Sequence, residues 1–329
     1  MKRSFAQLST AALAAGAALA LSVAVPAFAQ DKIDKPVKIL VGFPPGGTAD
    51  IMARAVADKM KDSLGQPVIV ENRPGAIGRI AADAVKAAAP DGTTIMVMPI
   101  GPMAVVPHTY KTLSYDPIKD FAPIGMGSTF QFAIAAGPQS GARTWPEYVA
   151  WAKANPSKSS YATSGAGSLP HFFGLLLARE SGIEMLHVPY KGSAAYMNEL
   201  IGGNVPTAVD AIADLTEQHR AGKIKILASS GAKRSTAVPE VPTFTEIGIK
   251  GGEAEGWFGF FAPAKTPKAI VDQLNRSLNQ ALTSPEIADR LTKLGLDPRT
   301  TTPEEFGRIL AADYAKWGPV VKASGFTAE

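Results

Sequence analysis

A loop rich in glycine and proline, Gly42–Asp50, separates an apolar run from an amphipathic segment. The run Val37–Val41 predicts a short buried strand, and the four-residue apolar period of Ala49–Leu64 predicts a helix. The loop therefore leads into a helix N-terminus, where backbone N–H groups lack intrahelical partners and the helix dipole is positive. Because glycine lets a ligand approach the backbone closely, this arrangement predicts an anion-binding loop. An ordinary turn in which Thr48 caps the helix is the alternative.

The second half of the sequence repeats this arrangement. A predicted strand, Ser159–Thr163, leads through the loop Ser164–His171 into a predicted helix, Leu169–Glu180. Neither loop contains Lys or Arg, so the pair predicts an anion held by the backbone dipoles of two helix ends that face each other across a cleft. The candidate ligand-binding residues of the two loops are Phe43, Pro45, Gly46, Gly47, Thr48, Asp50, Ser164, Gly165, Gly167, Ser168 and His171.

Two further candidates follow predicted strands of the second half. Tyr190 comes after the strand Met185–Val188, and Asp210 comes after the strand Val205–Val209. Parallel sheets bind their ligands beyond the carboxyl ends of their strands, so both side chains are candidates for the same site. A surface aromatic at Tyr190 and a helix cap at Asp210 are the alternatives.

Serine and histidine in the second loop also require a test for catalysis. Neither Ser164 nor Ser168 has the flanking glycines of a nucleophile elbow, and Pro170 replaces the last glycine of a dinucleotide fingerprint. The four histidines are scattered, with no pair at i, i+4. We therefore expect no catalytic residue, no metal site and no cofactor. An exported serine hydrolase that uses Ser168 and His171 is the enzyme alternative.

The N-terminal segment has the pattern of an export signal. Lys2 and Arg3 precede an apolar stretch, and Ala27–Ala29 forms a small-x-small cleavage site. Residues 1–29 are therefore the predicted signal peptide, cleaved after Ala29, and the product is expected in the periplasm. No later run of about 18 apolar residues occurs, so this product is not expected to be embedded in a membrane. The chain contains no cysteine, which excludes disulfides and a lipidated cysteine anchor.

Charge and the order of the elements restrict the class of protein further. The signal segment carries two of the 33 basic residues and no acidic residue, which leaves a net charge of +2 against 29 acidic residues. No basic face with interleaved aromatics appears, which argues against nucleic acid as a partner. Alternating strand and helix patterns predict an α/β fold with mostly parallel sheets flanked by helices. The predicted lobes are 30–127 together with 262–329, and 128–261, with Phe130–Ile134 and Trp257–Phe261 as crossing strands.

Several ordered motifs together resemble the Bug family, the solute receptors of tripartite tricarboxylate transporters. The resemblance extends from about Lys35 to the C-terminus, and its motifs are Val41–Asp50, Val70–Ala76, Pro90–Gly92, Tyr115–Pro117, Ser164–Ser168, His187–Gly192, Val241–Thr243 and Trp257–Gly259. It implies a two-lobed, type II-like periplasmic binding fold that closes on a small, usually carboxylated, solute. It also implies delivery to a small and a large membrane subunit. In that family backbone amides, hydroxyls and ordered water hold one ligand carboxylate, which here implies Phe43, Gly46, Gly47, Thr48, Ser164, Gly165, Gly167 and Ser168.

Three stretches depart from the family pattern, namely Ala76–Arg79, Thr129–Phe132 and Ala208–Asp210. Such stretches tune the pocket, so we expect them to set the identity of the ligand. The sequence thus predicts a monomeric periplasmic receptor for a small organic acid and not an enzyme. A receptor whose ligand feeds a signalling partner, without import, is the alternative that the sequence leaves open.

Overall fold

The computed structural model describes residues 32–327, so the predicted signal peptide and its cleavage site lie outside the described residues. The strands of the described part are β1 (Val37–Val41), β2 (Val68–Asn72), β3 (Thr94–Pro99), β4 (Phe121–Ala136), β5 (Ser160–Thr163), β6 (Leu186–Pro189), β7 (Thr207–Ala211), β8 (Lys225–Ser229), β9 (Glu255–Pro263) and β10 (Leu296–Pro298). Its helices are α2 (Thr48–Leu64), α3 (Arg79–Lys86), α4 (Val106–Thr109), α5 (Trp145–Ala154), α6 (Leu169–Ser181), α7 (Ser193–Ile201), α8 (Ile212–Arg220), α9 (Lys268–Thr283), α10 (Pro285–Lys293) and α11 (Pro303–Ser324). Short helical turns are η1 (Ala76–Gly78), η2 (Gly101–Val105) and η3 (Pro156–Lys158).

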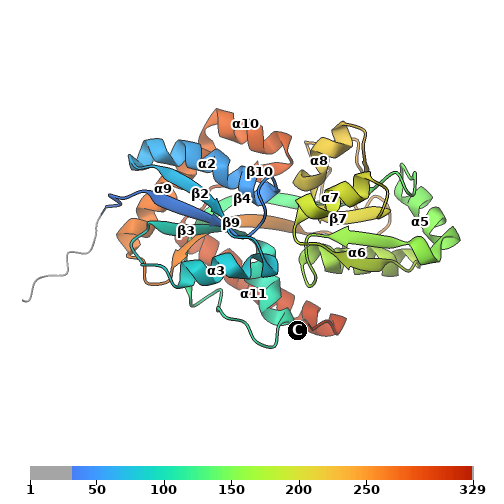
Figure 1. The fold of residues 1–329 in the computed structure, drawn as a ribbon, viewed down its shortest axis with the longest axis horizontal. Helices are drawn as coiled ribbons and strands as arrows, with labels where there is room; N and C mark the ends of the chain where they lie inside the picture. The colour runs from blue at the N-terminus through green and yellow to red at the C-terminus, as the bar shows by residue number, and fades with distance from the viewer. Residues whose placement is uncertain (1–31, 328–329) are drawn as a thin grey trace, which may run out of the picture. The chain divides into compact units, whose positions relative to one another are not determined.

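The strands form two groups that share β4. In the first group β1 lies between β2 and β3 in parallel, and β9 pairs antiparallel with β3 and β4. In the second group β5 pairs in parallel with β6 and β7, while β7 and β8 pair antiparallel with β4. The predicted α/β fold with helices on the sheets is confirmed, and the sheets are mixed because β4 and β9 run against their neighbours (Figure 1).

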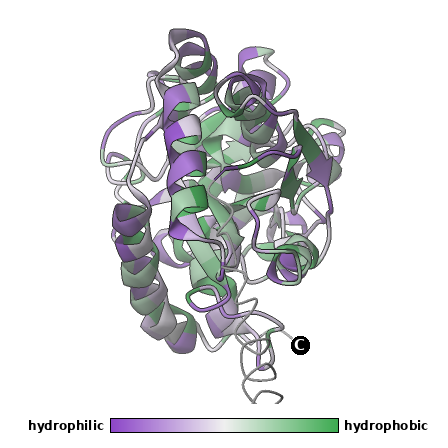
Figure 2. Cartoon of the chain, turned by 90° about the vertical axis from the view of Figure 1, so that its left-hand side faces the viewer, coloured by the Kyte–Doolittle hydropathy of each residue, from purple (hydrophilic) through white to green (hydrophobic). Residues whose placement is uncertain are grey.

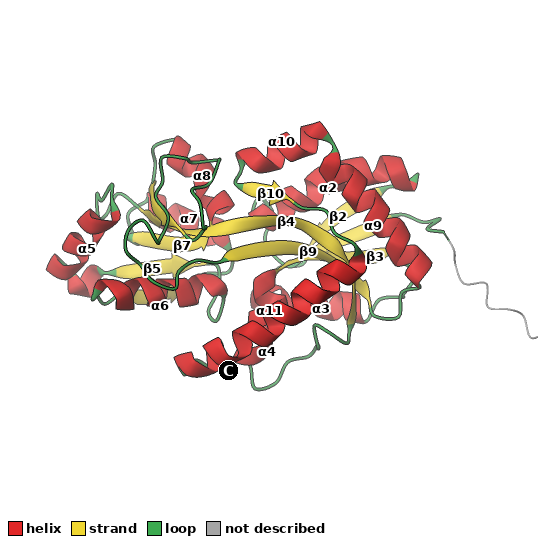
Figure 3. Cartoon of the chain, turned by 180° about the vertical axis from the view of Figure 1, so that it is seen from behind, coloured by secondary structure: helices red, strands yellow, loops and turns green. Residues whose placement is uncertain are grey.

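Strand β4 is much longer than the predicted strand Phe130–Ile134, because it begins at Phe121. Its pairing with β9 shifts register between Pro123 and Gly125, and such an irregularity tolerates a proline that donates no hydrogen bond. Residues up to Gln131 pair with β9, whereas residues from there onward pair with β7 and β8. Strand β4 therefore carries the chain from one group of strands to the other, alongside β9 (Figure 3). The lobe boundaries drawn from the sequence stay a prediction.

The helices cover this framework with their apolar faces. Helix α2 buries Met52, Val56, Met60 and Leu64, which confirms the four-residue period, and it ends at Gly65 in the left-handed conformation. The same division is visible in Figure 2, where hydrophobic strands lie inside and the helices turn hydrophilic faces outward. Within residues 32–327, no helix is both long and apolar enough to cross a membrane.

Aromatic side chains keep the core continuous where β4 changes its partners. The rings of Phe130 and Phe258 join β4 to β9 with centroids 4.8 Å apart. The ring of Phe132 packs on Phe173 of α6 at 4.9 Å. All four side chains are almost fully buried. The crossing strands therefore form a continuously packed base on which the residues of a site can be placed.

Candidate ligand-binding site

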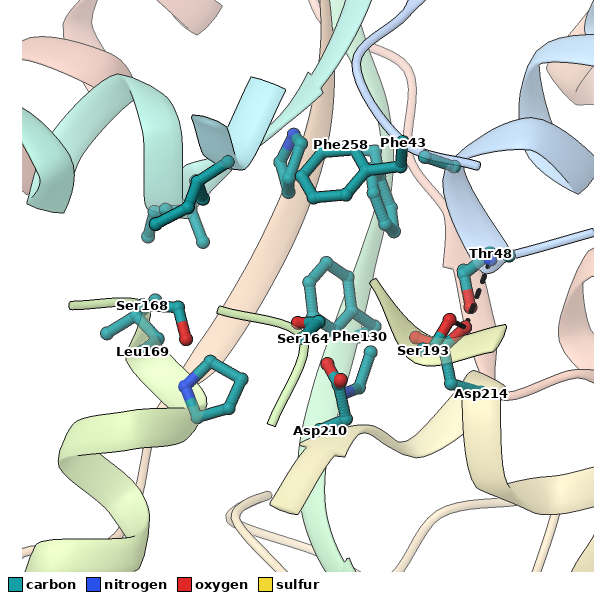
Figure 4. Close-up of a pocket in the computed structure, with 18 of the residues that line it drawn as sticks. Phe43, Thr48, Phe130, Ser164, Ser168, Leu169, Ser193, Asp210, Asp214 and Phe258 are labelled. Atoms are coloured by element: carbon teal, nitrogen blue, oxygen red, sulfur yellow. Dashed lines mark hydrogen bonds between the residues drawn. The ribbon is translucent and has the colours of Figure 1, made fainter. Parts of the chain in front are cut away.

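A cavity with a free volume of about 80 Å³ lies over the crossing strands (Figure 4). Phe130 and Phe132 of β4 and Phe258 of β9 contribute to its lining. Both glycine loops reach it, the first at the N-terminus of α2 and the second at the N-terminus of α6. The volume is room for roughly five water-sized groups, which suits a small solute.

The structure brings together six of the thirteen residues selected from the sequence. The residues that line the cavity are Phe43, Gly47, Thr48, Ser164, Ser168 and Asp210. Gly46 lines an adjoining hollow that shares Thr48 and Asp214 with the cavity, and Gly165 and Tyr190 line another that shares Phe43 and Ser164 with it. The remaining four, which line neither the cavity nor these two hollows, are Pro45, Asp50, Gly167 and His171. Ligand contact by any of the thirteen stays a prediction.

The Asp50 side chain holds the conformation of the first loop through hydrogen bonds. Its buried carboxylate accepts the Gly46 N–H at 3.0 Å and the Asn72 side chain at 2.8 Å, and it pairs with Arg54 at 2.9 Å. Burial alone would raise the pKa of Asp50, but the hydrogen bonds from Arg54, Gly46 and Asn72 together lower it. Asn72 also donates to the carbonyl of Phe43. Asp50 therefore stays ionised and fixes the backbone that carries Phe43 into the cavity.

The N-terminus of α2 already holds a carboxylate. The N–H of Thr48 donates to Oδ1 of Asp214 at 3.1 Å, and the Ser193 hydroxyl donates to the same oxygen at 2.9 Å (Figure 4). Asp214 lies in the first turn of α8 and Ser193 begins α7, so both come from the second half of the chain. Sequence reasoning missed both residues. The only sequence signal for Asp214 was its position four residues after the candidate Asp210, which would place it one helical turn further along.

The second loop is held by its own hydrogen bonds. Oγ of Ser168 donates to the Gly165 carbonyl at 2.6 Å, and the Gly167 N–H donates to Nδ1 of His171 at 3.1 Å. The His171 ring stacks on His187 with centroids 3.9 Å apart, and burial lowers the pKa of His171 to about 4. His171 is thus neutral at neutral pH and orients the loop. The Ser168 hydroxyl is directed to Gly165 and not to His171, which is unlike the serine–base pair of a hydrolase.

Two carboxyl groups lie close together at the cavity. Asp210 is 4% exposed; its Oδ1 accepts the Ala211 N–H at 2.9 Å, and its Oδ2 has no hydrogen-bond partner within residues 32–327. Burial, and then the neighbouring Asp214, raise the pKa of Asp210 to about 7. The nearby hydroxyls of Ser164 and Tyr196 oppose this rise without giving Oδ2 a hydrogen bond of good geometry. Burial also raises the pKa of Asp214.

The stretches that depart from the family pattern all contribute to the lining. Ile77 has φ of 55°, a left-handed conformation that is strained for a β-branched residue, and its side chain reaches the cavity. It also lies against Gly165, where an added Cβ would be 3.1 Å from an Ile77 carbon. The other two stretches contribute Phe130, Phe132 and Asp210. The strain at Ile77 therefore places an apolar side chain between the two loops.

The lining contains no Lys and no Arg, as the loops predicted. Sequence reasoning left residues 99–123 without assigned elements, and this segment adds Pro99–Pro102 at the start of η2. Among the described residues no group of three or more His, Cys, Asp or Glu is placed to hold a metal ion. The arrangement can therefore bind a solute through backbone dipoles, hydroxyls, carboxylates and aromatic rings.

Comparison with known proteins identifies the class of this site. The family described as "Tripartite tricarboxylate transporter family receptor" matches residues 52–326. The structure of the periplasmic binding protein BugD is 34% identical with a TM-score of 0.85 and covers 90% of this chain and 100% of that one. MatC (Rpa3494) from Rhodopseudomonas palustris with bound malate is 31% identical with a TM-score of 0.82, over 88% and 99% of the chains. Rpa4515 of R. palustris with adipate is 31% identical with a TM-score of 0.85 and covers 89% of this chain and 98% of that one.

These matches confirm the resemblance to the Bug family and the two-lobed periplasmic binding fold. The family match includes the second glycine loop and the crossing strands, and the solved structures cover 88–90% of this chain. Members of the family are solute receptors and not enzymes, which agrees with the geometry of Ser168 and His171. The chain belongs to the tripartite tricarboxylate transporter family receptors, the periplasmic solute-binding proteins that include BugD.

Proposed function

We propose that this chain is a periplasmic receptor that encloses one small carboxylate in the cavity and delivers it to the small and large membrane subunits of a transporter. The observation that carries the proposal is that both glycine loops and both crossing strands meet at one cavity of about 80 Å³. Malate in MatC and adipate in Rpa4515 support the carboxylate class. The protein acts as a monomer, one ligand to one chain.

The ligand carboxylate is expected at the N-terminus of α6. In the first turn of this 13-residue helix, Pro170 has no N–H and the N–H groups of Leu169 and His171 have no intrahelical acceptor, and both Ser168 and Leu169 line the cavity. Because the lining has no Lys or Arg, these dipoles and the Ser164 hydroxyl supply the positive potential. At the facing helix α2 the N–H of Thr48 already donates to Asp214. Helix α6 is therefore the better anion site of the two.

Occupancy of this cavity is coupled to closure of the lobes. Thr48 begins α2, which packs beside β1 and β2, whereas Asp214 lies on α8, which packs beside β4 and β7. Their hydrogen bond therefore joins the two groups of strands across the cavity. A ligand that touches both loops gains contacts only in this arrangement, so it stabilises the closed state.

Isothermal titration calorimetry tests the carboxylate assignment. The protein from residue 30 onward is unfolded and refolded to remove co-purifying solute, then titrated with small mono- and dicarboxylates, each beside its primary amide. We expect affinity to fall at least about tenfold in the amide, because the helix N–H groups lose a charged acceptor. Salt dependence should be modest, since the bound charge is shielded from bulk ions. Equal affinity for acid and amide would show that the carboxylate assignment is wrong.

Transport and export need separate measurements. Uptake of the labelled ligand should stop when this chain is deleted from cells that keep the membrane subunits, and should return when it is restored. Unchanged uptake would favour the signalling alternative. N-terminal sequencing of the periplasmic protein should begin at Gln30, after cleavage at Ala29. A product that retains the apolar stretch would contradict the predicted cleavage.

A further inference from the structure

The cavity carries a charge pattern that a carboxylate ligand alone does not explain. We propose that Asp210 forms a second subsite that binds an ammonium group, so that the solute of this receptor is an amino carboxylate and not a dicarboxylate. The inference rests on the proposed function, because it assumes that the solute occupies this cavity with its carboxylate at α6.

Asp210 is the group that lacks a partner. It is 4% exposed, and Oδ1 is satisfied by the Ala211 N–H at 2.9 Å. In the part of the chain that the structure describes, Oδ2 has no hydrogen bond of good geometry, although the hydroxyls of Ser164 and Tyr196 lie near this carboxyl group, which points into the cavity (Figure 4). Buried polar atoms in native proteins are almost always hydrogen-bonded, so this oxygen requires a donor. A solute in the cavity can supply this donor to Oδ2 of Asp210.

Asp214 sets the sign of the charge that this donor must carry. Its Oδ1 already accepts the Thr48 N–H and the Ser193 hydroxyl, so it needs little from a ligand. It still places a second carboxyl group beside Asp210, with no Lys or Arg in the lining to balance the pair. A further carboxylate from the solute would add a third like charge, whereas an ammonium compensates the two that are present.

The rival arrangement is a protonated Asp210 that donates to a second carboxylate of the ligand. Burial and the neighbouring Asp214 raise the pKa of Asp210 to about 7, so the protein surroundings disfavour a negative charge on this carboxyl group. Near pH 7 Asp210 is therefore about half protonated, and a dicarboxylate would bind the protonated form whereas an ammonium binds the ionised form. The preference for an ammonium follows from the incomplete hydrogen bonding of Oδ2 and from the second carboxyl group of Asp214, and not from the protonation of Asp210.

The rest of the lining describes the body of the solute. Phe130, Phe258, Ile77 and Leu169 contribute carbon surface to the lining. Ser168 and Leu169 lie on one side of the cavity, with Ser164 and Asp210 beside them and the pair Thr48–Asp214 beyond (Figure 4). The ligand class that fits is therefore a small amino acid or ω-amino acid with an apolar body.

Matched ligands test the subsite by calorimetry on the refolded chain. The probes are the neutral amino acids and 4-aminobutanoate, each titrated beside its deaminated acid and its decarboxylated amine, together with succinate. We expect at least one amino acid to bind about tenfold or more tightly than its deaminated acid, because a charge-assisted hydrogen bond is lost. If no pair shows this preference, or if succinate binds more tightly than every amino acid, the Asp210 subsite is wrong.

Two variants assign the preference to a residue. Asp210→Asn should reduce the ratio of amino acid to deaminated acid to near one while the deaminated acid still binds. The matched control Asp297→Asn changes an exposed carboxyl on β10 outside the cavity, and should keep the wild-type ratio. An Asp210→Asn protein that keeps the preference would overturn the inference, and the wild-type ligand pairs decide it even if this variant does not fold.

The same titrations separate the two proposals. A protein that binds deaminated acids as tightly as amino acids keeps the carboxylate receptor and loses the ammonium subsite. A protein that binds the amines as tightly as the amino acids loses the carboxylate assignment and keeps the subsite. Binding of neither acids nor amino acids would contradict both.

Discussion

The Asp210→Asn substitution should stabilise the ligand-free protein at alkaline pH and have less effect at acid pH. Burial and Asp214 raise the pKa of Asp210 from 3.8 to about 7. Below about pH 4 the group is protonated in both the folded and the unfolded chain. Between about pH 4 and pH 7 the unfolded chain ionises first, so the free energy of unfolding of the wild type falls as pH rises. Above about pH 7 this cost is constant.

The size of the effect follows from the pKa. Each factor of ten in an ionisation constant is worth about 1.4 kcal/mol, so the rise to about 7 costs the wild type up to about 4 kcal/mol at pH 8. Asparagine has no charge to bury, so the variant lacks this cost. The difference in unfolding free energy between the variant and the wild type should therefore grow by up to about 4 kcal/mol from pH 4 to pH 8.

Urea unfolding at pH 4.5, 6, 7 and 8 measures this difference for wild type and Asp210→Asn without ligand. Buried groups such as His171 titrate in both proteins and cancel in the comparison. Asp297→Asn is again the control: burial also raises the pKa of Asp297, but this residue is largely exposed and lacks the neighbouring carboxyl that acts on Asp210, so its difference from the wild type should change less with pH. A difference between Asp210→Asn and wild type that stays constant across this range would refute the argument that the cavity destabilises a charged Asp210.

Three substitutions at the loops and at the hydrogen bond across the cavity have distinct expected outcomes. Gly47→Val should weaken ligand binding, because the new Cβ would lie 3.2 Å from Oγ of Ser193 across the cavity. Its Tm should change little, because φ of −79° at this position suits any residue. Wild-type affinity would contradict this prediction. Gly167→Val should instead lower Tm, because φ of 73° strains a β-branched residue by about 1–3 kcal/mol and its Cβ would be 2.8 Å from the Phe326 ring. An unchanged Tm would show that the loop relaxes freely. Asp214→Ala removes the acceptor of the Thr48 hydrogen bond across the cavity, worth about 1–3 kcal/mol, and also the acceptor of the Ser193 hydroxyl on its own side. Small-angle scattering should therefore show a larger radius of gyration without ligand, and an unchanged radius would show that the Thr48–Asp214 bond does not hold the lobes together.

The sequence by itself determined the local units of this protein. Strand, glycine loop and helix follow one another at Val37–Leu64 and again at Ser159–Glu180, and the structure confirms both units within one or two residues at each end. Apolar periodicity reports which face of one element is buried, and glycine and proline report where the chain turns, so both signals are readable without a partner. The same local signals placed Phe43, Ser164 and Asp210 at the edge where they line the cavity.

Only the tertiary structure decided which groups meet at the cavity. The Thr48 N–H was predicted to be free for an anion, but Asp214, 166 residues away, accepts it. Nothing in the local pattern of α8 specifies this contact, because it depends on how the two groups of strands and their helices are placed in the tertiary structure. The length of β4 was missed for a related reason: its first residues carry Pro123 and alternate poorly, and they become a strand through pairing with β9. The strained turn at Ile77 is likewise held by its surroundings, since local sterics disfavour it.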